Sequence, residues 1–85
     1  MKQIKLFYLK NCPFCKKAFA YMDKLKQQDI YKPVEIELIE ESEQAELADR
    51  YDYYYVPTFY IDGEKVHEGG IFESEVEAIF KKALE

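Results

Sequence analysis

The chain has 85 residues and a formal net charge of −5 at pH 7, because 17 Asp and Glu outnumber 12 Lys and Arg. This length predicts one domain spanning residues 1–85, near the lower limit for a chain that folds without disulfide or metal staples. The acidic balance argues against nucleic acid and anionic membrane as partners, since both require a basic surface.

The first predicted element is a strand over residues 3–9, in which apolar side chains follow one another closely. Such a run is typical of a central strand that is buried on both faces of a sheet. Residues 1–10 carry a charge at Lys5 and lack a small-residue cleavage site, so they do not resemble a secretory signal. No apolar run approaches the roughly 20 residues that a membrane helix needs. We therefore expect a cytoplasmic protein.

The motif Cys12-Pro13-Phe14-Cys15 follows this strand and holds both cysteines of the chain. Pro13 suits the first position of a helix, where its missing N–H is no loss. A helix over residues 13–28 is predicted because apolar residues recur on one face, at Cys15, Ala18, Phe19, Met22 and Leu25. A Cys-x-x-Cys pair alone fits a zinc half-site, a structural bridge or a redox couple. A bridge across so short a loop would stabilise little, and a zinc site would lack donors because the chain has one histidine.

A second strand is predicted after Pro33, where Val34, Ile36 and Leu38 alternate with glutamates in the pattern of a half-buried strand. Ser42 is expected to start a short second helix that extends to Tyr51. The glutamates of this region are expected to form a solvated face, which consists of Glu35, Glu37, Glu40, Glu41 and Glu43.

A hairpin and a C-terminal helix complete the predicted elements. Residues 56–61 and 65–68 are predicted strands, and Asp62-Gly63 between them is a strong signal for a tight turn. Gly69-Gly70 then breaks the chain, and the segment from Ser74 has the form of a helix capping box. The predicted order is βαβαββα, an α/β fold with a central four-stranded mixed sheet flanked by three helices on its two faces.

Three features coincide in this order along the chain. The cysteine motif lies between a strand and a helix, Val56-Pro57-Thr58 opens the third strand, and Gly69-Gly70 precedes the last helix. Together they resemble the glutaredoxin branch of the thioredoxin superfamily, over essentially the whole chain. The resemblance implies a thioredoxin-like fold, with Cys12 as the exposed nucleophile and Cys15 as the buried resolving thiol. It also implies a cis Pro57 that shapes a substrate groove, with the two glycines at the end of a glutathione groove.

The substrate or glutathione groove is expected to draw on three segments around Cys12. Phe14 is expected to face solvent near the sulfurs. Tyr55 ends an unusual run of tyrosines and either lines the groove or packs the second helix onto the sheet. His67 is expected at the surface of the fourth strand without a catalytic role. The predicted groove residues are Lys10, Pro13, Phe14, Tyr55, Val56, Pro57, Gly69 and Gly70.

The thiolate is the form of cysteine that attacks a disulfide. Cys12 is predicted to lie at the start of a helix, where free N–H groups and the helix dipole favour negative charge. Among the nearby lysines, Lys16 is the preferred electrostatic support because it lies one turn from the helix start. Burial on the apolar face disfavours the thiolate of Cys15. Cys12 is therefore expected to react first.

The predicted function is that of a thiol–disulfide oxidoreductase, which reduces protein disulfides or glutathione-mixed disulfides. We expect a monomer without a bound cofactor or metal, with disulfide-containing proteins as partners and glutathione as co-substrate. Leu9, Tyr55 and Ile71-Phe72 differ from the residues that are usual in glutaredoxins. The alternative is therefore a thioredoxin-like electron carrier that a flavin-dependent reductase recharges. A module that holds an iron–sulfur cluster between two subunits is a third, less favoured alternative.

Overall fold

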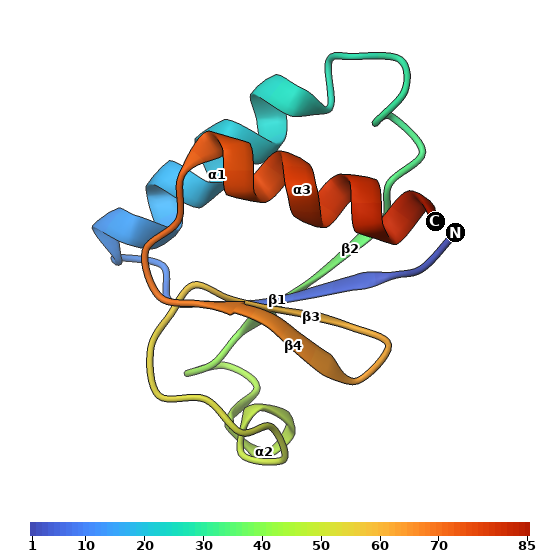
Figure 1. Cartoon of the computed structure of the whole chain (residues 1–85). Helices are drawn as coiled ribbons and strands as arrows, with labels where there is room; N and C mark the ends of the chain where they lie inside the picture. Colours follow the sequence, from blue (N-terminus) through green and yellow to red (C-terminus); the bar gives the residue numbers. More distant parts are fainter.

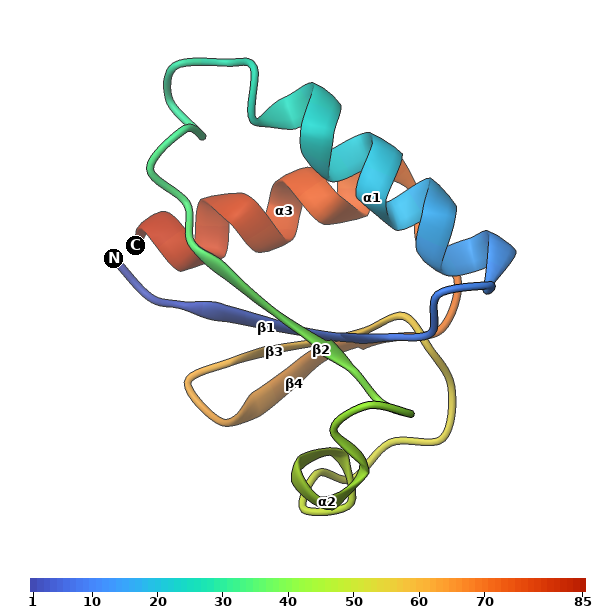
Figure 2. The same ribbon diagram turned by 180° about the vertical axis from the view of Figure 1, so that it is seen from behind.

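The computed structural model describes residues 1–85 and shows one four-stranded mixed sheet with helices on both faces (Figures 1 and 2). The strand order in the sheet is β2-β1-β3-β4. This architecture confirms the predicted fold class and the predicted order of elements. The elements are β1 (Ile4–Tyr8), α1 (Pro13–Leu25), β2 (Ile36–Glu40), α2 (Ala45–Ala48), β3 (Thr58–Ile61), β4 (Glu64–Glu68) and α3 (Glu73–Leu84).

Strand β1 lies in the interior of the sheet, parallel to β2 and antiparallel to β3. Its side chains alternate between the two faces. Ile4 and Leu6 enter the core on one face, and Phe7 enters a second core on the other face. The prediction that both faces of this strand are buried is therefore confirmed. The strand ends at Tyr8, so its carboxyl end delivers the chain to the cysteine motif.

Two hydrophobic cores hold the layers together. The larger core lies between the sheet and the helices α1 and α3, which cover the same face (Figure 1). The smaller core lies under α2, where the ring centroid of Phe7 is 4.7 Å from that of Tyr51 and 4.9 Å from that of Tyr53. These two tyrosines therefore pack the α2 segment onto the sheet. None of the helices has the length and the apolar character needed to span a bilayer.

Each helix differs from its predicted bounds for a local reason. Helix α1 ends at Leu25 rather than at residue 28. Helix α2 does not start at Ser42, because the Ser42 hydroxyl donates a hydrogen bond to Glu40 Oε1 at 2.5 Å instead of capping a helix. Helix α3 is capped two residues earlier than predicted, since the Phe72 N–H donates to Glu75 Oε1 at 2.9 Å.

The predicted burial of the second strand's apolar face is correct for Val34 and Ile36, which join the larger core, but wrong for Leu38. Leu38 pairs with Leu6 across the sheet yet is 45% exposed, because β2 is an edge strand. Glu40 was expected in a solvated face but is only 4% exposed. Strands β3 and β4 begin at Thr58 and Glu64, close to the predicted starts at residues 56 and 65.

Candidate active site

Cys12 is the residue that caps the start of α1. Its backbone is extended, with φ −91° and ψ 117°, and Pro13 occupies the first helical turn. The Cys15 N–H donates a hydrogen bond to Cys12 Sγ at 3.3 Å. The first N–H groups of a helix lack partners within the helix, so a capping side chain normally accepts from one of them. Here the cap is a sulfur, and the same geometry stabilises negative charge on it.

The Val56-Pro57 peptide bond lies on the other side of this sulfur. It is cis, as predicted, and Cys12 Sγ lies 3.9 Å from the Val56 carbonyl oxygen, to which the thiol donates. Pro57 is buried, and the Val56 N–H donates no hydrogen bond within the chain. The backbone of Val56 therefore presents polar groups beside the partly exposed thiol of Cys12.

Cys15 is buried, whereas Cys12 is partly exposed. Cys15 is 1% exposed and packs in the face of α1 that turns toward the sheet. Burial, followed by the hydrogen bond with Cys12, raises the pKa of the Cys15 thiol to about 12. Both residues are free thiols in this structure. The pair thus consists of an accessible sulfur at a helix start and a neutral, buried sulfur one turn later.

The Gly69-Gly70 turn follows the carboxyl end of β4 and contacts Pro57 and Phe14 of this site. Gly69 has φ +91°, a conformation that favours glycine, and its N–H donates to the Pro57 carbonyl at 2.8 Å. A Cβ atom on Gly70 would lie 3.3 Å from the Phe14 ring, so that ring rests on the turn. Phe14 and Tyr55 remain 56% and 70% exposed beside it. The structure therefore gathers the predicted groove residues of three segments around the two cysteines.

The two predicted lysines lie outside this cluster of contacts. The Lys10 ammonium forms an ion pair with Glu43, which raises the pKa of Lys10. Its charge is therefore compensated by a residue before α2. Lys16 is exposed and forms no ion pair. Its proposed electrostatic role stays a prediction, as do the individual roles of the groove residues.

Sequence reasoning missed a carboxylate that holds the loop before Pro57. Glu68, the last residue of β4, accepts hydrogen bonds at Oε2 from the N–H groups of Tyr54 at 2.5 Å and Tyr55 at 3.0 Å. Its Oε1 accepts from Lys65 Nζ at 2.7 Å. Lys65, followed by the two N–H groups, lowers the pKa of Glu68 to about 2. No local pattern marks this residue, because its backbone partners lie in another segment.

Sequence reasoning also missed Glu40, because its burial and its bond with the Lys10 N–H are set by tertiary structure. Its carboxylate accepts from the Ser42 N–H at 2.7 Å, from the Ser42 hydroxyl and, through Oε2, from the Lys10 N–H at 3.0 Å. These bonds, the Ser42 hydroxyl first, lower the pKa of Glu40 although its burial opposes the change. A buried charge is tolerated when hydrogen bonds satisfy it. Glu40 thereby fastens the loop that carries Cys12 to the end of β2.

His67 is more enclosed than expected for a surface residue of the fourth strand. Its side chain is 18% exposed, and its Nε2 lies 2.8 Å from the Gly70 carbonyl oxygen. Its Nδ1 lies 3.8 Å from Glu75 Oε2 at the start of α3. His67 therefore links the Gly69-Gly70 turn to its own strand.

Comparison with known proteins gives a family and a fold. The model of the family described as glutaredoxin matches residues 4–66. No curated protein matches the chain. A solved structure described as that of a malarial protein has a TM-score of 0.77 at 20% identity and covers 100% of this chain and 99% of its own.

Two further solved structures resemble the chain. The thioredoxin Mala s 13 of Malassezia sympodialis has a TM-score of 0.77 at 20% identity, over 96% of this chain and 74% of its own. The NTD_N/C domain of the alkyl hydroperoxide reductase AhpF from Enterococcus faecalis has a TM-score of 0.71 at 26% identity, over 96% of this chain and 37% of its own. The fold is therefore that of the thioredoxin superfamily.

The difference between the two thiols predicts selective alkylation. With a pKa of about 12, Cys15 stays almost entirely in its thiol form at pH 8. Iodoacetamide at pH 8 is expected to modify Cys12 alone in the folded protein and both cysteines in denaturant, as measured by peptide mass spectrometry. Equal rates at the two cysteines of the folded protein would contradict this assignment of accessible and buried sulfur.

The carboxylate of Glu68 predicts a loss of stability in acid. Its pKa falls from 4.5 to about 2 on folding, so the unfolded chain binds the proton first as the pH decreases. Its contribution is complete above pH 4.5 and is lost as the pH falls toward 2. The unfolding free energy of Glu68→Gln, measured by urea denaturation, should therefore change less over this range than that of the wild type. Parallel pH profiles for the two proteins would rule out a stabilising charge at Glu68.

Proposed function

The chain belongs to the glutaredoxin family, and we propose that it reduces disulfides through the dithiol of Cys12 and Cys15. A thiol–disulfide redox function agrees with the family, with the thioredoxin fold and with the two neighbouring cysteines. Disulfides and thiols are accordingly its substrates and reductants in general terms. The observation that carries the proposal is the contrast between the two sulfurs, one at a helix cap and one 1% exposed.

The reaction begins when the Cys12 thiolate attacks one sulfur of the substrate disulfide. The first substrate thiolate leaves and takes a proton, and a mixed disulfide joins the substrate to Cys12. Cys15 then loses its proton, and its sulfur attacks Cys12 Sγ. The second substrate thiol leaves, and Cys12 and Cys15 become a disulfide. Two electrons pass from the protein dithiol to the substrate, and an external thiol or a flavoprotein restores them.

The surroundings of Cys12 support an extended polypeptide as the group that carries the disulfide. The Val56 N–H has no partner within the chain, and the Val56 carbonyl is met only by the Cys12 thiol. A passing strand can satisfy such exposed backbone groups. Phe14 and Tyr55 flank the position with exposed rings that can contact the neighbouring side chains of a substrate. Protein disulfides and glutathione-mixed disulfides are the proposed substrates.

Glutathione is the proposed reductant, and a flavin-dependent reductase is the second candidate. The Lys10–Glu43 ion pair supports this second candidate. Glu43 compensates the positive charge of Lys10, which could otherwise attract the carboxylates of glutathione. The chain as a whole is also acidic, with a net charge of −5. The proposed setting is the cytoplasm, where such dithiols are kept reduced.

Serine substitutions test the order of the two cysteines. Cys12→Ser removes the attacking sulfur and is expected to lower disulfide reductase activity to background. Cys15→Ser leaves the first step intact but removes the resolving thiol, so it should accumulate a mixed disulfide at Cys12. Turnover with a peptide disulfide and intact-mass spectrometry measure these outcomes. Full activity of Cys12→Ser would contradict the proposal.

Coupled assays distinguish the two reductants. NADPH oxidation is followed with glutathione and glutathione reductase in one arm, and with thioredoxin reductase alone in the other. If glutathione is the donor, the first arm should turn over rapidly and the second should stay at background. The reverse result would assign the chain to the thioredoxin-like carriers.

A further inference from the structure

We propose that Glu68 is a positioning residue of the disulfide-exchange site, one that holds the Val56-Pro57 segment in place for the substrate. The inference rests on the proposed function of Cys12. It assigns a role to a carboxylate that neither reacts nor contacts the sulfurs. Three sets of contacts support it, from the loop before Pro57, from the turn after β4 and from the hairpin itself.

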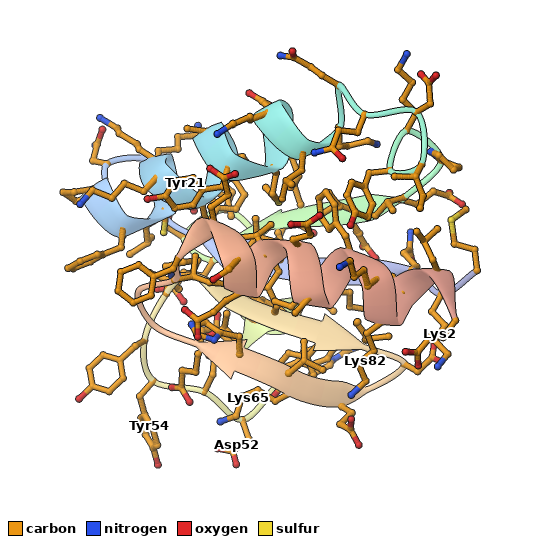
Figure 3. All side chains as sticks on the ribbon, turned by 45° about the horizontal axis from the view of Figure 1, so that its top comes forward. Lys2, Tyr21, Asp52, Tyr54, Lys65 and Lys82 are labelled. Atoms are coloured by element: carbon orange, nitrogen blue, oxygen red, sulfur yellow. The ribbon has the colours of Figure 1, made fainter.

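The carboxylate holds two successive backbone groups at once. Its Oε2 accepts from the Tyr54 and Tyr55 N–H groups, at 2.5 and 3.0 Å. Its Oε1 accepts from Lys65, and Lys65 also donates to the Asp52 carbonyl at 3.2 Å. Figure 3 shows Lys65 of β4 beside the loop that carries Asp52 and Tyr54. Charge-assisted bonds of this kind are stronger than bonds between neutral groups.

The end of the loop at Tyr54 and Tyr55 depends on these bonds, whereas Tyr51 and Tyr53 earlier in the loop pack against Phe7. Residues 49–57 contain no helix or strand. Tyr54 and Tyr55 are 85% and 70% exposed, so burial of their rings contributes little. Side chains of β3 also anchor the loop, since the Thr58 hydroxyl donates to the Tyr55 carbonyl and the Tyr60 hydroxyl donates to the Asp52 carbonyl. The Tyr53 hydroxyl donates to Glu41 Oε1 at 2.7 Å. Segments with few buried apolar contacts open easily when such bonds are lost.

Glu68 and Gly69 bind the chain on either side of the Val56-Pro57 dipeptide, which lies beside Cys12. Glu68 holds Tyr55, which directly precedes Val56, and the Gly69 N–H holds the Pro57 carbonyl at 2.8 Å. The Val56 carbonyl between these anchors lies 3.9 Å from Cys12 Sγ. Loss of the Glu68 carboxylate therefore releases one side of the dipeptide, while the helix cap at Cys12 keeps its own hydrogen bond.

This arrangement predicts that substrate binding and sulfur reactivity separate in a variant. In Glu68→Ala the displaced Val56 backbone binds an extended substrate less well. The KM for a peptide disulfide should rise up to about tenfold, as expected for the loss of one backbone hydrogen bond between Val56 and the substrate. The rate of Cys12 alkylation by iodoacetamide, a small reagent that needs no docked backbone, should stay within twofold of the wild type.

Three variants and one measurement without turnover test the inference. Glu68→Gln keeps an oxygen that can accept from the Tyr54 and Tyr55 N–H groups but loses the negative charge, so its KM should lie between those of the wild type and Glu68→Ala. Glu64→Gln is the matched control, because Glu64 begins the same strand, is exposed and pairs with Lys82 at 3.1 Å. Its KM should equal that of the wild type. Hydrogen exchange at the Tyr54 and Tyr55 amides should be at least tenfold faster in Glu68→Ala.

The outcomes separate the inference from the proposed function. Wild-type protein without Cys12-dependent turnover would contradict the proposed function itself. Normal wild-type turnover with an unchanged KM in Glu68→Ala would contradict only the positioning role. Unchanged amide exchange at Tyr54 and Tyr55 would show that Glu68 does not hold the loop. If Glu68→Ala does not fold, the KM of Glu68→Gln is compared with that of Glu64→Gln instead. Equal KM values in those two variants would overturn the inference.

Discussion

The hydrogen bond from the Cys15 N–H to Cys12 Sγ fixes the reactive sulfur at the start of α1. The bond exists because only three residues separate the end of β1 from Cys12 and Pro13 opens the helix directly after it. It places Cys12 where the helix dipole favours a thiolate, and the same helical turn carries Cys15 into the core. One local geometry thus creates both the nucleophile and its protected partner.

The second half of the site comes from segments that are distant along the chain. The cis bond before Pro57 lies beside Cys12, and the turn at Gly69 holds the Pro57 carbonyl. The pairing of β3 with β4 brings these segments together, since Thr58 is opposite Glu68 in the sheet. Glu68 then fastens the exposed loop that precedes the cis bond. The position of the Val56-Pro57 segment beside Cys12 therefore depends on the register in which β3 pairs with β4.

The spacing of apolar residues along the chain was enough to predict which face of a helix or strand a side chain occupies. The burial of Cys15 followed from the apolar stripe of its helix, because residues one turn apart share a face. Leu38 was predicted on the correct face but not as exposed, because a sequence does not state which strand is at the edge. The role of Ser42 as a helix start failed because Glu40 takes its hydroxyl. Glu68 escaped prediction because its backbone partners are set by tertiary structure alone.

The reduction potential of the Cys12–Cys15 couple tests the central claim most directly. Equilibration with dithiothreitol or glutathione buffers, followed by mass spectrometry, measures it. An accessible sulfur paired with a buried thiol should behave as a reversible two-electron couple with a potential between about −270 and −180 mV, the range of thioredoxins, glutaredoxins and related exchange proteins. A potential below about −300 mV, as in structural disulfides, or the absence of an intramolecular disulfide, would contradict the account.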